Sequence, residues 1–127
     1  MARVRYIVDD VDAAIGFYTE QLGFAVVMHP GPGFALLSRA DLELAISAAS
    51  GPGGGSQAMP DGRVPEPGGW NRIMLEVSDL AAEVERLRAA GAGFRGEIVT
   101  GRGVRQILLD DPAGNPVELF EPLARDT

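Results

Sequence analysis

The stretch YIVDDVDAAIGFYTEQLGF, residues 6–24, decides the fold because a related stretch, LEVSDLAAEVERLRAAGAGF, returns at residues 75–94. Superimposing the two copies places Asp10 on Asp79, each between a short alternating apolar segment and a helical pattern. An aspartate at such a boundary is a preferred helix N-cap, since its carboxylate accepts a bond from a free backbone N–H of the first turn. The repeat therefore predicts a strand followed by a helix in each half of the chain.

Both predicted helices have one apolar stripe at helical spacing, which predicts that each packs one side against a sheet. Gly23 and Gly91 follow the stripes, where a glycine commonly ends a helix. The first stripe consists of Val11, Ala14, Ile15, Tyr18 and Leu22, and the second of Leu80, Val84 and Leu87.

Three strand-like runs follow each helix, separated by turn sequences such as HPGPG and DDPAGN. The chain thus has the pattern β-α-β-β-β twice, which predicts an α+β fold. We expect a single domain over residues 1–127, with module one at 1–48, a loop at 49–69 and module two at 70–123. The runs are residues 24–28, 34–38 and 42–47 in the first half, and 94–100, 104–109 and 116–120 in the second.

Composition excludes several functional classes. The net charge of −7 disfavours nucleic acid, whose phosphates require a basic surface. No apolar run has the ~20 residues of a membrane-spanning helix, and no signal-peptide pattern begins the chain, so we expect a cytoplasmic protein. The absence of cysteine and the single histidine, His29, exclude zinc–thiolate sites and any site with two histidines from one chain.

The Gly/Pro-rich loop at 49–69 is long for a compact domain, and such loops are usually functional or disordered. Two interpretations remain open, a flexible linker between the modules or a lid over a site. Met59 and Arg63 are its most conspicuous side chains.

The helix DVDAAIGFYTEQLGF, the ending DPAGNPVELFEP and the repeat together resemble the vicinal oxygen chelate superfamily. That superfamily includes glyoxalase I, extradiol dioxygenases, fosfomycin-resistance enzymes and bleomycin-resistance proteins. The resemblance covers nearly the whole chain. It implies two tandem βαβββ modules that form a curved mixed sheet around a cavity, and it implies a homodimer.

The resemblance also implies four metal-ligand positions, occupied in metalloenzymes of the family by His, Glu, His and Glu. In this chain they fall on Arg3, Glu43, Arg72 and Glu118. Arginine stays protonated and has no lone pair for a metal, so we expect no metal cofactor. The arginines can instead pair bidentately with the glutamates. A structural charge cluster, a ligand-binding group and a cryptic metal site remain open.

Strand alternation predicts which side chains face the cavity. The resulting mixed surface suits a medium-sized ligand with an apolar body and polar groups. Trp70 is either a core or edge anchor or a stacking surface at the cavity rim, and His29 is expected to be a solvated turn residue, with a general-base or ligand role left open. The predicted ligand-binding cavity comprises Arg3, Arg5, Glu43, Trp70, Arg72, Met74, Glu76, Glu118 and Phe120.

These features favour a metal-free small-molecule-binding protein that sequesters a compound such as an antibiotic or a metabolite. The alternative is a divalent-metal-dependent lyase, isomerase or dioxygenase, for which the retained Glu43 and Glu118 are the motivation. A third possibility is a metal-free enzyme with Glu43, Glu76 or Glu118 as general base. The sequence leaves the existence and identity of any catalytic residue open. Bound metal would favour the second hypothesis, and binding of small molecules without metal the first.

Overall fold

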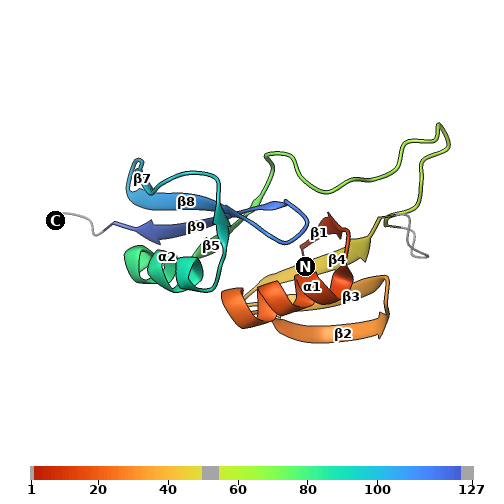
Figure 1. The fold of residues 1–127 in the computed structure, drawn as a ribbon, viewed down its shortest axis with the longest axis horizontal. Coiled ribbons are helices and arrows are strands. Elements are labelled where there is room, and N and C mark those ends of the chain that lie inside the picture. Colours follow the sequence, from red (N-terminus) through yellow and green to blue (C-terminus); the bar gives the residue numbers. More distant parts are fainter. Residues whose placement is uncertain (1, 50–54, 124–127) are drawn as a thin grey trace. The chain divides into compact units, whose positions relative to one another are not determined.

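The structure is a computed structural model that describes residues 2–49 and 55–123. It divides into two compact units (Figure 1). The first consists of Met1–Gly69 with Pro112–Asn115, and the second of Trp70–Asp111 with Pro116–Thr127. Both units combine helix with a mixed sheet, so the predicted α+β class is confirmed.

The first unit contains a mixed sheet with the strand order β1-β4-β3-β2. β1 runs parallel to β4, while the β4–β3 and β3–β2 pairs are antiparallel. In chain order its elements are β1 (Arg3–Val8), α1 (Val11–Gly16), a π-helix η1 (Phe17–Gln21), β2 (Ala25–Gly31), β3 (Phe34–Arg39) and β4 (Leu42–Ala48).

The second unit has the corresponding order β5-β9-β8-β6, with the short β7 also paired to β8. β5 is parallel to β9, and the other pairs are antiparallel. Its elements are β5 (Ile73–Glu76), α2 (Leu80–Ala89), β6 (Gly93–Phe94), β7 (Val99–Thr100), β8 (Val104–Asp110) and β9 (Pro116–Pro122).

The predicted helix boundaries at the two aspartates are confirmed. Asp10 and Asp79 each accept a bond from the backbone N–H three residues later, at 3.1 Å. Gly91 has φ 88°, and the N–H of Ala92 reaches the carbonyl of Leu87 at 3.0 Å. The left-handed conformation of Gly91 ends α2, because it turns the chain so that the next N–H can bond a carbonyl left free at the end of the helix.

The apolar stripes form the core of each unit. Tyr18 is fully buried and makes an edge-to-face contact with Phe24, with the ring centroids 5.4 Å apart. Leu80, Val84 and Leu87 of α2 are buried in the second unit. Helical spacing in the sequence therefore identified the buried side of both helices.

Two elements differ from the predictions. The first helix does not stay α-helical as far as Leu22, because the chain turns as a π-helix from Phe17. Within this segment Thr19 Oγ1 donates to the carbonyl of Ile15 at 2.7 Å, and a side-chain bond to the carbonyl four residues earlier competes with the regular backbone bond and distorts helices. The predicted strand at 94–100 is split into β6 and β7, which leaves residues 95–98 outside both strands.

The register with β8 shows why that strand breaks. Phe94 pairs with Leu109 and Val99 with Gln106, so four residues, 95–98, lie opposite only two, 107 and 108. The surplus residues bulge out of the ladder, as extra residues in one strand of an antiparallel pair do. The bulge presents Arg95, Gly96 and Glu97 on the side of the sheet where a pocket lies.

The turn before β9 is anchored in the first unit through Asn115, which is buried. Its amide nitrogen donates to the carbonyl of Ile7 on β1, and its side-chain oxygen accepts from the N–H of Gly68, both at 2.7 Å. The first bond satisfies a carbonyl of the edge strand β1, and the second satisfies a backbone N–H of the loop that precedes β5.

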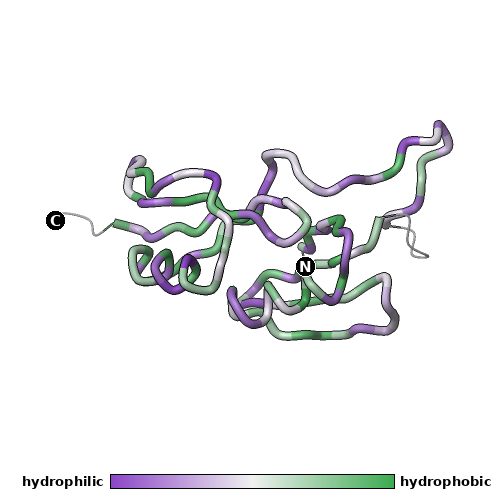
Figure 2. The backbone as a smooth tube through the Cα atoms, viewed as in Figure 1, coloured by the Kyte–Doolittle hydropathy of each residue, from purple (hydrophilic) through white to green (hydrophobic). Residues whose placement is uncertain are grey.

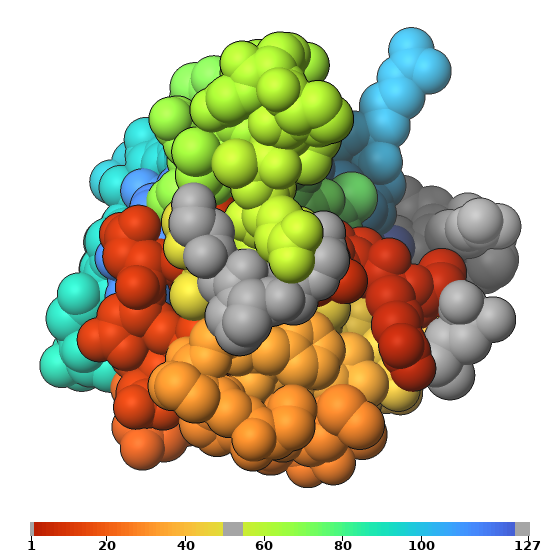
Figure 3. Space-filling model, turned by 90° about the vertical axis from the view of Figure 1, so that its right-hand side faces the viewer, coloured from red at the N-terminus to blue at the C-terminus, as the bar shows by residue number. Residues whose placement is uncertain are grey.

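β2 forms the opposite edge of the first sheet and has an unusually apolar exposed surface. Val26, Val27 and Met28 are each about half exposed, at 47%, 50% and 49%. Figure 2 shows this stretch as a hydrophobic segment, and Figure 3 shows the surrounding β2–β3 region, in orange, as open surface.

Across residues 2–49 and 55–123, no helix has the length and apolarity to cross a membrane.

Candidate functional site

The strand registers place the predicted site residues of each unit on one side of its sheet. Arg3 pairs with Glu43 across the parallel β1–β4 ladder, and Arg5 pairs with Ala45. In the second unit, Met74 pairs with Glu118, and Glu76 with Phe120. Directly opposed residues on neighbouring strands point to the same side of a sheet. The predicted alternation is therefore present within each unit.

The first arginine–glutamate pair is a single contact at the surface. Arg3 Nε lies 2.7 Å from Glu43 Oε1, and the Arg3 side chain is 61% exposed. Next to it, Arg5 Nη1 donates to Ser47 Oγ at 2.6 Å. Solvent screens such an exposed pair, so it contributes little to stability.

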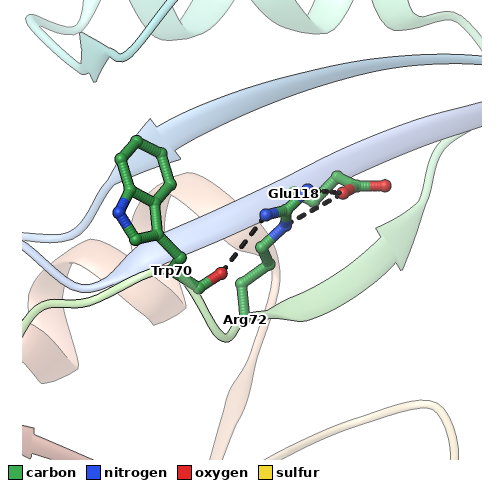
Figure 4. A network of polar contacts seen from close by, with 3 residues as sticks. All are labelled: Trp70, Arg72 and Glu118. Carbon is green, nitrogen blue, oxygen red and sulfur yellow. Dashed lines mark hydrogen bonds and ion pairs between the residues drawn. The ribbon is translucent and has the colours of Figure 1, made fainter.

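The second pair is much more buried. Arg72 Nε and Nη2 both donate to Glu118 Oε1, at 3.1 and 2.9 Å, and Arg72 Nη1 donates to the carbonyl of Trp70 at 3.2 Å (Figure 4). The Glu118 side chain is only 4% exposed. This network holds the guanidinium at the start of β5 against the centre of β9.

Neither pair has the predicted bidentate form, in which two nitrogens meet two oxygens. Arg3 uses one nitrogen, and Arg72 directs two nitrogens to the same oxygen of Glu118. The Trp70 carbonyl explains the second case, because it binds Nη1 and fixes the guanidinium orientation. Glu118 Oε2 then has no bonding partner among the residues that the structure describes.

The donor atoms at these positions do not fit a divalent metal. Each glutamate is within hydrogen-bond distance of a guanidinium, which repels cations and has no lone pair to offer. Within residues 2–49 and 55–123, no three His, Asp or Glu side chains are grouped so that they could hold a metal ion.

A pocket of about 220 Å³ lies on the Arg72–Glu118 side of the second unit. The bulge between β6 and β7 forms part of its wall. Its lining combines apolar side chains with two arginines and two acids: Trp70, Arg72, Arg95, Gly96, Glu97, Val99, Gln106, Ile107, Leu108 and Glu118.

Trp70 stands on the pocket wall with 69% of its surface exposed, so it is not a core residue. The guanidinium of Arg95 lies over its ring, 4.7 Å from the centroid, and Arg95 Nε donates to Asp110 Oδ1 at 2.6 Å. The salt bridge holds Arg95 in place, and the cation–π contact in turn restrains the indole.

The pocket unites three of the predicted cavity residues, Trp70, Arg72 and Glu118. Arg3, Arg5 and Glu43 belong to the first unit, while Met74, Glu76 and Phe120 lie on β5 and β9 without lining this pocket.

Sequence reasoning did not include Arg95 or Gln106 in the site. Alternation offered a signal for Arg95, because it follows Phe94 and must point to the opposite side of the sheet. The bulge that brings it to the pocket depends on the pairing with β8, which is not visible in the sequence.

Other conspicuous residues belong to the first unit and do not line the pocket of the second unit. His29 belongs to β2 rather than to a turn, with Nε2 4.0 Å from Asp12 Oδ1. In the loop at 49–69, Met59 is exposed and Arg63 pairs with Asp61 at 2.8 Å. Residues 50–54 of this loop lie outside the described residues, and the choice between linker and lid stays open.

Known structures resemble this chain over nearly its full length. A member of the glyoxalase/bleomycin resistance protein/dioxygenase superfamily from Sphaerobacter thermophilus is 27% identical, with 95% of both chains covered and a TM-score of 0.75. TnmS3, an antibiotic-binding protein from a Streptomyces species, is 25% identical over 94% of this chain and 93% of its own, with a TM-score of 0.70.

The fosfomycin-resistance protein FosX from Listeria monocytogenes shares the fold alone, at 17% identity over 100% of this chain and 94% of its own, with a TM-score of 0.69. The comparison with curated proteins gives no match. The model of the Glyoxalase/Bleomycin resistance protein/Dioxygenase superfamily matches residues 1–119, so the chain belongs to this superfamily.

Proposed function

We propose that the protein binds a small molecule without a metal and sequesters a compound such as an antibiotic or a metabolite. The observation that carries this proposal is the Arg72–Glu118 pair in the pocket wall. While Arg72 is bound to the buried carboxylate of Glu118, the pair can still form hydrogen bonds with a ligand. A metal ion could bind Glu118 only if the guanidinium of Arg72 were displaced.

The character of the pocket supports the same function. Apolar side chains and a few fixed polar groups are the usual lining of a small-molecule site, in which the polar groups orient the ligand. Arg95 is fixed by Asp110, and Arg72 by Glu118 and the Trp70 carbonyl. The similarity to TnmS3, an antibiotic-binding protein, is consistent with this class of function.

The alternative is a divalent-metal-dependent lyase, isomerase or dioxygenase. The two glutamates favour it, because they stand at the positions that the family resemblance assigns to metal ligands. It requires both arginines to leave their carboxylates and a water or substrate to complete the coordination sphere, since two carboxylates are few ligands for a divalent ion.

We further infer that the protein acts as a homodimer. The exposed apolar segment of β2 supports this, since an open apolar edge strand is an aggregation hazard in a monomer unless another chain covers it.

The proposed function is tested by a broad fragment screen on protein treated with chelator and then desalted. Calorimetry measures binding, and elemental analysis of untreated protein measures bound metal. Saturable binding to the metal-free protein is expected. A stoichiometric divalent metal whose removal abolishes binding would replace this proposal with the alternative. A screen without a single binder would contradict the function itself.

A further inference from the structure

Building on the proposed function, we propose that the pocket of the second unit takes a flat, neutral aromatic ligand whose edge bears a hydrogen-bond donor and a hydrogen-bond acceptor. A lactam fused to an aromatic ring is the simplest chemistry of this class. Three properties of the pocket lead to this ligand class.

The first property is the hydrogen-bonding capacity left on the Arg72–Glu118 pair. A guanidinium has five N–H groups, and Arg72 uses one on each of its three nitrogens, so two N–H groups remain. Glu118 Oε2 has no partner within the described part of the chain (Figure 4). The pair therefore offers free N–H donors on Arg72 and a free acceptor on Glu118, and a neutral ligand that has both a donor and an acceptor can bond to either residue.

The second property is the charge balance of the lining. The ionised side chains are Arg72 and Arg95 against Glu97 and Glu118, which sum to zero despite the chain's net charge of −7. Each of these charges has a partner within the protein: Glu118 pairs with Arg72, Arg95 pairs with Asp110, and Glu97 pairs with Arg88. A charged ligand would lose its hydration without gaining an unpaired counter-ion, which disfavours both cations and anions.

The third property is the shape of the apolar surface. Trp70 exposes most of its surface although Arg95 lies over the ring, and an aromatic ring can stack on the part that remains open. Buried Ile107 and half-exposed Val99 extend the apolar wall. The volume of about 220 Å³ is below the ~300–1,000 Å³ of typical ligand pockets, which favours one or two fused rings.

The test compares three bicyclic probes of similar size: 2-quinolone as the neutral lactam, 1-methylquinolinium as the cation and quinoline-2-carboxylate as the anion. Calorimetry gives the affinities. Trp70 is the only tryptophan, so its single indole N–H signal in a nitrogen–proton correlation spectrum reports binding at the pocket. We expect 2-quinolone to bind at least tenfold more tightly than either ion and to shift the indole signal.

Variants then test the polar contacts. In Glu118→Gln the one remaining side-chain oxygen accepts from Arg72, and an NH₂ group replaces the acceptor, so 2-quinolone should bind at least tenfold more weakly. Glu83→Gln removes a surface carboxylate of α2 that pairs with Arg86, and it should change the affinity less than twofold. Trp70→Phe, measured by calorimetry, should weaken binding through loss of stacking area even if Glu118→Gln does not fold.

The outcomes separate the ligand class from the proposed function. If either ion binds as tightly as 2-quinolone, or if the Glu118→Gln and Glu83→Gln variants behave alike, the ligand class is wrong. If no bicyclic probe binds while the fragment screen yields binders, the ligand class is also wrong and the binding function stands. If neither experiment yields a binder, both proposals fail.

Discussion

Replacing Arg72 by methionine keeps an unbranched apolar side chain but leaves the Glu118 carboxylate, whose side chain is 4% exposed, without its partner. Breaking a buried ion pair from one side costs about 3–5 kcal/mol. The Arg72 side chain is 29% exposed and Glu118 is a lining residue of the pocket, so water relieves part of that cost. We expect a loss of about 2–3 kcal/mol in the free energy of unfolding.

The first unit provides a matched comparison. Arg3→Met removes the same kind of group from Glu43, but the Arg3 side chain is 61% exposed, the Glu43 side chain is 16% exposed against 4% for Glu118, and the contact is a single one. An exposed pair of this kind contributes about 0–1 kcal/mol. The difference in burial between the two pairs therefore predicts a difference in stability of about 2 kcal/mol between the variants.

Urea denaturation followed by circular dichroism measures both losses. With an m-value of about 2 kcal/mol per molar, the midpoint of Arg72→Met falls by about 1–1.5 M and that of Arg3→Met by less than about 0.5 M. The double variant Arg72→Met, Glu118→Leu should regain most of the loss, because no buried charge remains. Equal losses for the two single variants, or no recovery in the double variant, would refute the role of burial.

Two further predictions concern the N-cap of α2 and the oligomeric state of the protein. Asp79→Ala removes the cap on the N–H of Ala82 and should cost about 1 kcal/mol in the same denaturation assay, while Asp79→Asn, which keeps an acceptor, should cost less. Val27→Lys places a charge on the exposed edge strand β2 and should shift the protein from dimer to monomer. Light scattering coupled to size-exclusion chromatography measures the mass, and the control Asp61→Lys should leave it unchanged. An unchanged mass for Val27→Lys would exclude this edge as the dimer contact.

Local chemistry made part of the fold predictable from the sequence. Asp10 and Asp79 mark helix starts, and Gly91 marks a helix end, because each satisfies backbone groups within a few residues. The π-turn from Phe17 and the split between β6 and β7 were not predicted. The split depends on two separate pairings with β8, Phe94 with Leu109 and Val99 with Gln106, and local periodicity contains no information about that register.

In the candidate site, too, some features could be predicted from the sequence and others depend on tertiary structure. The family resemblance placed Arg72 and Glu118 in one group with Arg3 and Glu43, without indicating which arginine pairs with which glutamate. The single-oxygen geometry could not be foreseen, because it depends on the Trp70 carbonyl. Arg95 enters the pocket through the bulge, which exists only once β8 has paired. Spacing therefore predicted the strand positions, while the contacts came from tertiary structure.

The bond between Asn115 and Ile7 has a consequence for biosynthesis, because it joins residues 108 positions apart. At ~5–20 residues per second, the ribosome needs roughly 5–20 seconds after making Ile7 before it reaches Asn115. During that interval the nascent first unit has an uncapped β1 edge, open to pairing with other chains. The first half of the protein is therefore synthesised before the residue that binds its edge strand, and during this interval β1 is open to pairing with other chains.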